Sequence, residues 1–239
     1  MKKALKVLVE ILLLIVCALL VVAIVKSVMK PVNFNKQKDY RESIAIQRLK
    51  DIRTLQVAYK SVNGKFCGTV DSLKLFYENG KMPIVMQVGS MDDSVAVMHT
   101  EAVKKAHKGK MTPEDWLALY MAGDKNLVFS VESKMDVKDT LFASREKSDV
   151  NNKEYFNIDS LKYIPFSGGE EVQMESVVKQ VSGVPVPLFE AKMPYKSLLK
   201  GLDNQLRINL DAEKRDQNRY EGLQVGSISA PNNNAGNWE

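Results

Sequence analysis

Residues 7–25 read VLVEILLLIVCALLVVAIV, and this run decides how the chain is organised. It holds nineteen residues with a single charge, Glu10. As a helix rising about 1.5 Å per residue, the run spans roughly 28 Å, which matches the hydrocarbon core of a bilayer. The sequence therefore predicts a transmembrane anchor within residues 1–30 that contacts the lipid bilayer through residues 7–25.

The run differs from a cleaved signal sequence. It is longer than the apolar region of a signal peptide, and no A-x-A-like cleavage pattern follows it. Val16 precedes Cys17, whereas a lipoprotein signal needs a small residue there. Lysines flank the run on both sides, so charge does not fix its orientation. Because a very short basic N-terminus is typical of an uncleaved signal anchor, we expect a single-pass protein of the bacterial inner membrane with a periplasmic C-terminal domain.

Glu10 allows two interpretations. A carboxylate at the centre of a membrane helix costs about 2.5–3.5 kcal/mol, but near the helix edge it costs less and can reach the interface. Glu10 is one turn inside the run, so a tolerated edge residue is the simpler interpretation. The alternative is a polar contact with another membrane helix or with a second copy of the chain.

A second helical pattern covers residues 36–62, after Pro31 and Asn33, which we expect to interrupt the first helix. Asn63 and Gly64 end it, which gives a stalk helix over residues 36–64. Its apolar residues recur every three or four positions. They form a stripe of Ile44, Ala45, Leu49, Ile52, Leu55, Tyr59 and Val62. The width of the stripe favours packing on a sheet, and a short dimeric coiled coil is the alternative, with Ile44, Leu49, Ile52, Leu55 and Tyr59 as the interaction residues.

The sequence of residues 65–228 is typical of one α+β domain, and residues 229–239 form a polar tail. Short helices are predicted after Asp71, across residues 99–110 and from Thr112, the last burying Trp116 and its neighbours. Strands are predicted at residues 83–89, 127–131, 207–210 and 223–228, together with an edge strand around Pro185 and Pro187. The predicted fold is α+β, with a long amphipathic helix packed on an antiparallel sheet.

The N-terminal third resembles type IV pilins and type II secretion pseudopilins. Glu10 lies early in the apolar run, as the family's membrane glutamate does. DIRTLQVAYKSVNGKF, residues 51–66, is similar to the family's helix end, and VDSLKLF, residues 70–76, to the segment that follows. The resemblance implies a membrane helix continuing into a helix that packs on a sheet. Ala4-Leu5-Lys6 replaces the family's processing site, so cleavage is not expected. The whole chain also resembles a group of bacterial inner-membrane proteins, and that resemblance implies no activity.

No catalytic pattern is present in the sequence. His99 and His107 are eight residues apart, which is wider than usual for zinc ligands. Residues 167–170, SGGE, lack the lysine of a P-loop, and no G-x-S-x-G motif occurs. The formal charge is only +5 and both signs alternate along the chain, so nucleic-acid binding is not expected. We therefore expect a non-enzymatic protein without a cofactor.

A possible calcium site is the exception. Asp211, Glu213, Asp216 and Asn218 supply oxygen ligands in a predicted loop, and the resemblance implies calcium, because some pseudopilins bind it near the C-terminus. Lys214 and Arg215 stand between these ligands, so a solvated hairpin loop is the simpler interpretation. No other metal site is predicted.

These features together favour an envelope assembly or scaffold protein. It would present a pilin-like domain to envelope proteins, or associate with itself, through Glu10 and the apolar stripe. The alternative is an anchored ligand-binding or sensor module.

Overall fold

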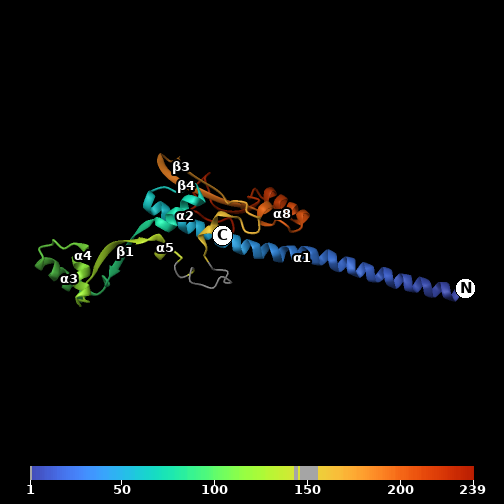
Figure 1. The fold of residues 1–239 in the computed structure, drawn as a ribbon, viewed down its shortest axis with the longest axis horizontal. Helices are drawn as coiled ribbons and strands as arrows, with labels where there is room; N and C mark the ends of the chain where they lie inside the picture. The colour runs from blue at the N-terminus through green and yellow to red at the C-terminus, as the bar shows by residue number, and fades with distance from the viewer. Residues whose placement is uncertain (1, 143–144, 146–155) are drawn as a thin grey trace. The chain divides into compact units, whose positions relative to one another are not determined.

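The computed structural model describes residues 2–142, 145 and 156–239 (Figure 1). The fold is α+β, as predicted, with a long apolar N-terminal helix and two small antiparallel sheets. The chain forms two compact units. Unit 1 contains Met1–Gln56, Phe66–Val70 and Asn157–Glu239, and unit 2 contains Val57–Lys65 and Asp71–Phe156. The segment that the sequence suggested as one domain, residues 65–228, therefore contributes to both units.

Helix α1, Lys2–Asn63, is a single helix of 62 residues. The predicted interruption at Pro31 is wrong, because the helix continues through this residue. Proline removes one backbone hydrogen bond and costs about 3 kcal/mol in a helix interior. Ending the helix would add the cost of nucleating a second one, so continuation is a physical alternative to a break. The predicted end is confirmed: Gly64 has φ +71° and donates to the Lys60 carbonyl at 2.8 Å.

The sheet of unit 1 has three antiparallel strands in the order β3-β4-β5. They are β3, Gln173–Val181, β4, Val184–Pro194, and β5, Gly222–Gly226. Ser182 and Gly183 join β3 to β4 with positive φ angles of 53° and 81°, which suits a two-residue hairpin turn.

Strand β4 is central and not an edge strand, which corrects the prediction made from Pro185 and Pro187. The prolines are tolerated because β5 pairs only with Glu190–Pro194, at the far end of β4. Among the strands of the described residues, β3 is the only neighbour of β4 over the prolines.

Three short helices complete unit 1: η1, Ile158–Lys162, α7, Tyr195–Leu198, and α8, Asn204–Asp216. Helix α8 replaces the predicted strand at residues 207–210 and the predicted loop after it. Asp203 caps α8 by accepting a hydrogen bond from the Leu206 amide at 2.9 Å. Lys214 and Arg215 lie in its last turn, where cations complement the helix dipole.

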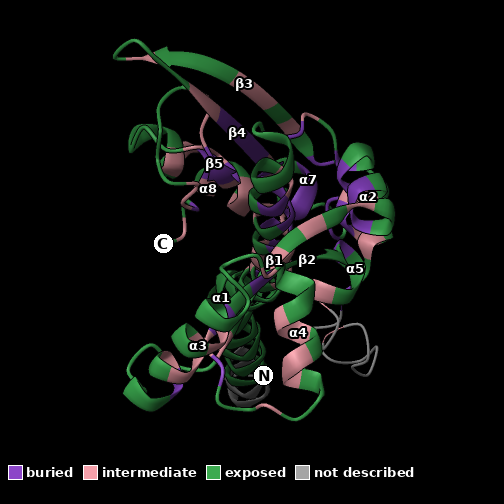
Figure 2. Ribbon diagram, turned by 90° about the vertical axis from the view of Figure 1, so that its left-hand side faces the viewer, coloured by how far each residue is buried: buried purple, intermediate pink, exposed green. Residues whose placement is uncertain are grey.

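The core of unit 1 forms where α1 faces β4 and α7. Leu49, Ile52 and Leu55 are fully buried on α1. Figure 2 shows buried residues along β4 and α7 as well, and Phe189 of β4 packs on Phe66 with ring centroids 4.8 Å apart. The C-terminal tail belongs to this unit, because Gly236 forms a β-bridge with Val225.

Unit 2 is built around a two-stranded sheet, β1, Lys81–Val88, and β2, Phe129–Asp136. Helix α2, Val70–Asn79, precedes the sheet, and α5, Val137–Thr140, follows it. Helices α3, Ser94–Ala106, and α4, Pro113–Met121, lie between the strands in sequence. The predicted start of α4 is confirmed, because Thr112 and Asp115 form a capping box. Its predicted burial is not: Trp116 is only partly buried against the core of Leu127, Phe129 and Val131.

Candidate functional site

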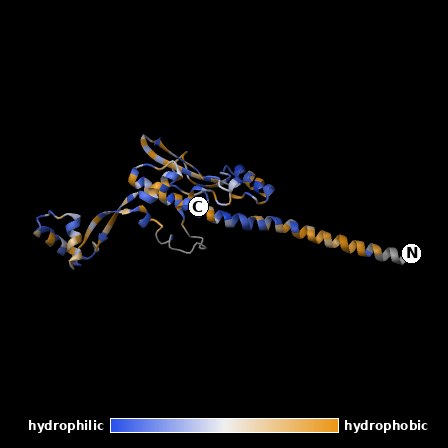
Figure 3. Ribbon diagram, viewed as in Figure 1, coloured by the Kyte–Doolittle hydropathy of each residue, from blue (hydrophilic) through white to orange (hydrophobic). Residues whose placement is uncertain are grey.

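The N-terminal part of α1 is exposed and apolar. Glu10 is exposed there, and Figure 3 shows hydrophobic residues dominating this part of the helix. Leu14 is 69% exposed and Leu19 is 64% exposed. Soluble proteins bury most of their leucines, whereas these two side chains remain mostly exposed in the folded chain. α1 is long and apolar enough to cross a membrane, which is compatible with an anchor.

The predicted interaction stripe occupies a different environment. Leu49, Ile52 and Leu55 are fully buried in the core of the chain. Ile44 and Tyr59 are only half-buried. The structure therefore assigns the centre of the stripe to packing within the chain. It does not leave these three residues available to a partner helix while the unit is folded.

Two arginines on α1 fasten the helix to the rest of unit 1. Arg41 donates from Nη1 to the backbone carbonyls of Leu198 at 3.0 Å and Lys200 at 2.8 Å. Arg48 donates in the same way to the carbonyls of Ser160 at 2.8 Å and Tyr163 at 2.7 Å. Desolvation by burial lowers the pKa of both guanidinium groups, and nearby Asp51 opposes the shift at Arg48.

Arg53 makes a third attachment, at the C-terminus of the chain. Its Nη1 pairs with the Glu239 carboxylate at 2.7 Å. The Glu239 pKa is lowered, first by this hydrogen bond. The three arginines therefore each contact a different segment of the C-terminal region, which holds α1 in a defined rotation about its axis.

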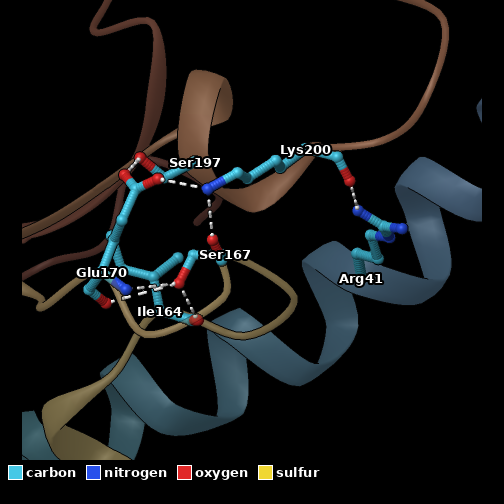
Figure 4. A network of polar contacts seen from close by, with 6 residues as sticks. All are labelled: Arg41, Ile164, Ser167, Glu170, Ser197 and Lys200. Atoms are coloured by element: carbon cyan, nitrogen blue, oxygen red, sulfur yellow. Dashed lines mark hydrogen bonds and ion pairs between the residues drawn. The ribbon is translucent and has the colours of Figure 1, made fainter.

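A polar network stabilises the segment that receives Arg41 (Figure 4). Lys200 donates from Nζ to the Ser167 carbonyl at 2.9 Å and to Glu170 Oε1 at 3.2 Å. The Ser197 hydroxyl donates to Glu170 Oε2. These contacts lower the Glu170 pKa, with Ser197 as the largest cause and Lys200 next. Because the Ser197 hydroxyl and the Lys200 ammonium both bond Glu170, the network positions α7 against the turn at residues 167–170.

The SGGE segment, residues 167–170, belongs to this network. The Ser167 hydroxyl donates to the Ile164 carbonyl at 2.8 Å and accepts from the Glu170 amide at 2.9 Å. Gly168 and Gly169 have φ of 80° and 103°, a conformation that favours glycine. The segment is therefore an internally bonded turn.

Gln56 is a buried polar residue that the sequence analysis did not single out. It is fully buried on α1 and bonds both backbone groups of Cys67, donating to the carbonyl at 2.7 Å and accepting from the amide at 2.9 Å. A buried amide satisfied on both sides fixes the segment after α1 against the helix. Cys67 itself is buried and both cysteines are free thiols.

The structure does not gather the predicted calcium ligands around one point. Asp211, Glu213 and Asp216 lie on α8, and Asn218 follows the helix with φ 53°. Asp211 is buried and paired with Arg207 of the preceding turn. In the ranges that the structure describes, no group of three or more histidine, cysteine, aspartate or glutamate side chains is placed to hold a metal ion. The calcium site therefore remains a prediction without geometric support.

The histidines lie in unit 2. His99 Nε2 is 2.8 Å from Asp124 Oδ2, and this hydrogen bond is the main cause of the lowered Asp124 pKa. His107 bonds the Val103 carbonyl of its own helix at 3.0 Å. The His99 side chain is partly exposed in this contact with Asp124.

Comparison with known proteins leaves the structure as the basis for any functional argument. No protein-family model, curated protein or solved structure matches this chain.

Proposed function

We propose that this chain is a non-enzymatic, single-pass membrane protein that presents a pilin-like domain to partner proteins of the bacterial envelope. The anchor lies in the inner membrane through residues 7–25, and the C-terminal units are periplasmic. The observation that supports this proposal most directly is the continuity of α1. One helix of 62 residues carries the exposed apolar segment at one end and the core of unit 1 at the other.

The continuity matters because it removes a flexible linker between anchor and domain. A helix of this length spans about 93 Å at 1.5 Å per residue. Arg41, Arg48 and Arg53 fasten unit 1 to the helix at three places. A domain held so firmly to its anchor takes a fixed orientation, which suits a protein that positions partners and also fits the pilin-like arrangement.

Within this proposal, Glu10 contacts a partner helix in the membrane. It is a carboxylate among exposed apolar side chains on α1, where hydrocarbon offers it no hydrogen bond. The buried centre of the stripe leaves the membrane segment as the part of α1 on which helix pairing can occur.

The test is crosslinking in intact cells, followed by mass spectrometry of everything that co-purifies with the full chain. Native Cys17 lies in the exposed segment and serves as a crosslinking handle, with Cys17→Ser as the control. A defined set of envelope proteins, or Cys17-dependent pairs of this chain, would support the proposal. A monomer without partners would refute it.

Charge reversal at Glu10 tests the proposed contact. We expect Glu10→Lys to abolish the crosslinked products, because a cation that can only donate hydrogen bonds replaces the accepting carboxylate. Glu10→Gln keeps hydrogen bonding and should retain them. Equal crosslinking in both variants would remove Glu10 from the interface.

A further inference from the structure

A pocket in unit 1 lies between α8 and the segment that leads into β5. Its volume is about 720 Å³, which is within the range of small-molecule sites. Helix α8 contributes Arg207, Ile208 and Arg215 to its lining, and the return segment contributes Arg219 and Tyr220. The pocket therefore combines apolar side chains with guanidinium groups.

Cations outnumber anions in this pocket. Lys196 and Arg219 complete a set of four cations with Arg207 and Arg215, and Asp211 and Glu221 are the two carboxylates. Asp211 pairs with Arg207, and Glu221 pairs with Arg215 at 2.7 Å.

Two of the four cations keep their charge uncompensated. Within the described part of the chain, the side chains of Lys196 and Arg219 have no ion pair and no hydrogen bond; Lys196 exerts only a weak electrostatic effect on Glu170. Both residues are exposed. The pocket thus carries an excess of two positive charges, which a phosphate dianion neutralises and a single carboxylate does not.

The paired arginines are held in position before any ligand binds. Arg207 donates to Asn204 Oδ1 from Nε at 3.2 Å and from Nη2 at 2.9 Å. It also pairs with Asp211. Arg215 uses only Nε to bond Glu221 at 2.7 Å. The two terminal nitrogens of Arg215 therefore remain able to donate, and a planar pair of N–H groups matches the oxygens of a phosphate.

The N-terminal end of α8 lies close to the C-terminal end of the apolar segment of α1. Asp203, the cap of α8, pairs with Lys30 of α1 at 2.7 Å. Lys30 follows the last residue of the apolar run by five positions, or about 8 Å along the helix. Figure 1 shows α8 beside α1, and its thirteen residues extend about 20 Å. If α1 is anchored as proposed, the pocket lies within reach of lipid headgroups.

We propose that this pocket binds a phosphate group, with Lys196 and Arg219 neutralising its charge and Arg215 donating to its oxygens. Ile208 and Tyr220 contact the less polar body of the ligand. The phosphate is a phosphomonoester, carried by a lipid headgroup or by a soluble phosphate compound. Only the lipid source depends on the proposed membrane anchor.

Binding is measured on the full chain with two probes. The first is inorganic phosphate, titrated by calorimetry against the chain in a non-ionic detergent. The second is a lipid nanodisc, made of phosphatidylcholine alone or with added phosphatidic acid, whose headgroup is a phosphomonoester, and lipids retained by the chain are identified by native mass spectrometry. We expect saturable binding in at least one arm, and the arm that gives it identifies the source.

The variant Lys196→Gln/Arg219→Gln removes both uncompensated charges. We expect it to weaken binding at least tenfold, because both cations contact the phosphate. The matched control, Lys65→Gln/Lys179→Gln, removes the same charge from exposed positions outside the pocket and should bind as the wild type does. Thermal unfolding of each variant checks that it folds.

Failure of binding in both arms, or equal weakening by the two double variants, would overturn the proposal. The outcomes also separate it from the proposed function. Phosphate binding by a chain that does not remain in membranes would leave the pocket in place and refute the anchor. A membrane-integrated chain that binds neither probe would refute the phosphate pocket and leave the membrane anchor in place.

Discussion

Replacing Leu49 with alanine should destabilise unit 1 by several kcal/mol. Leu49 is fully buried on α1. The change removes three buried methyl or methylene groups, whose transfer free energy is about 0.8 kcal/mol each, or roughly 2.4 kcal/mol in total, before the cost of the cavity is added. An unrelaxed cavity raises the cost of a buried leucine-to-alanine change to as much as about 5 kcal/mol. We therefore expect a loss of about 3–5 kcal/mol in the free energy of unfolding.

The assay is urea unfolding of the full chain in detergent, followed by tryptophan fluorescence. Trp116 lies in unit 2 and Trp238 in unit 1, so a Trp116→Phe background makes Trp238 the reporter for unit 1. The matched control is Val57→Ala, because Val57 lies on the same helix and is 48% exposed. This change should alter stability by less than about 0.5 kcal/mol.

Two results would refute this reasoning. A loss below about 1 kcal/mol for Leu49→Ala would show that the residue is not in a packed core. A midpoint that rises with protein concentration would show that the stripe packs against another chain, as in the coiled-coil alternative.

Two other changes probe the attachments of α1. Arg48→Ala removes the donor to the Ser160 and Tyr163 carbonyls and should lower the free energy of unfolding by about 1.5–3 kcal/mol in the same assay. Arg48→Lys should restore less than half of this loss. An unchanged midpoint for Arg48→Ala would contradict the proposed role. Because the Glu170 pKa is lowered, its ionised carboxylate stabilises the folded chain at pH values above the ordinary glutamate pKa. This stabilisation is lost as the pH falls through the lowered pKa. Glu170→Gln should therefore flatten the acid side of a stability–pH profile, whereas Glu175→Gln, an exposed glutamate on β3, should not.

The sequence was most informative where one residue type or one period dominated. The apolar run, the helix end at Gly64 and the capping box at Thr112 each follow from local chemistry, and the structure shows a helix or helix terminus at each. Pro31 was misleading because a proline indicates a possible break, whereas the cost of one missing hydrogen bond can be outweighed by helix continuity.

Helix α8 was misread for a local reason. Arg207-Ile208-Asn209-Leu210 alternates polar and apolar residues, and four residues are too few to separate a strand from a helix. The cap at Asp203 and the run of strong helix formers after Leu210 were the signals that pointed to a helix. The pocket was missed with it, because its cations converge only when α8 is helical.

The arginine attachments could not be predicted. Arg41 and Arg48 bond backbone carbonyls more than 100 residues away, and a backbone carbonyl has no signature in the sequence. The division into two units was equally hidden, because it depends on which segments pair across long separations.

Topology in cells tests the membrane anchor most directly. The chain carries Cys17→Ser and a new exposed cysteine at Lys179→Cys, and Cys67 is buried. Membranes are extracted with alkaline carbonate, and intact bacteria permeabilised only in the outer membrane are treated with an impermeant maleimide. We expect the chain to stay in the membrane fraction and residue 179 to react in the intact cells. Release by carbonate, or labelling only after the inner membrane is broken, would contradict an anchored periplasmic domain.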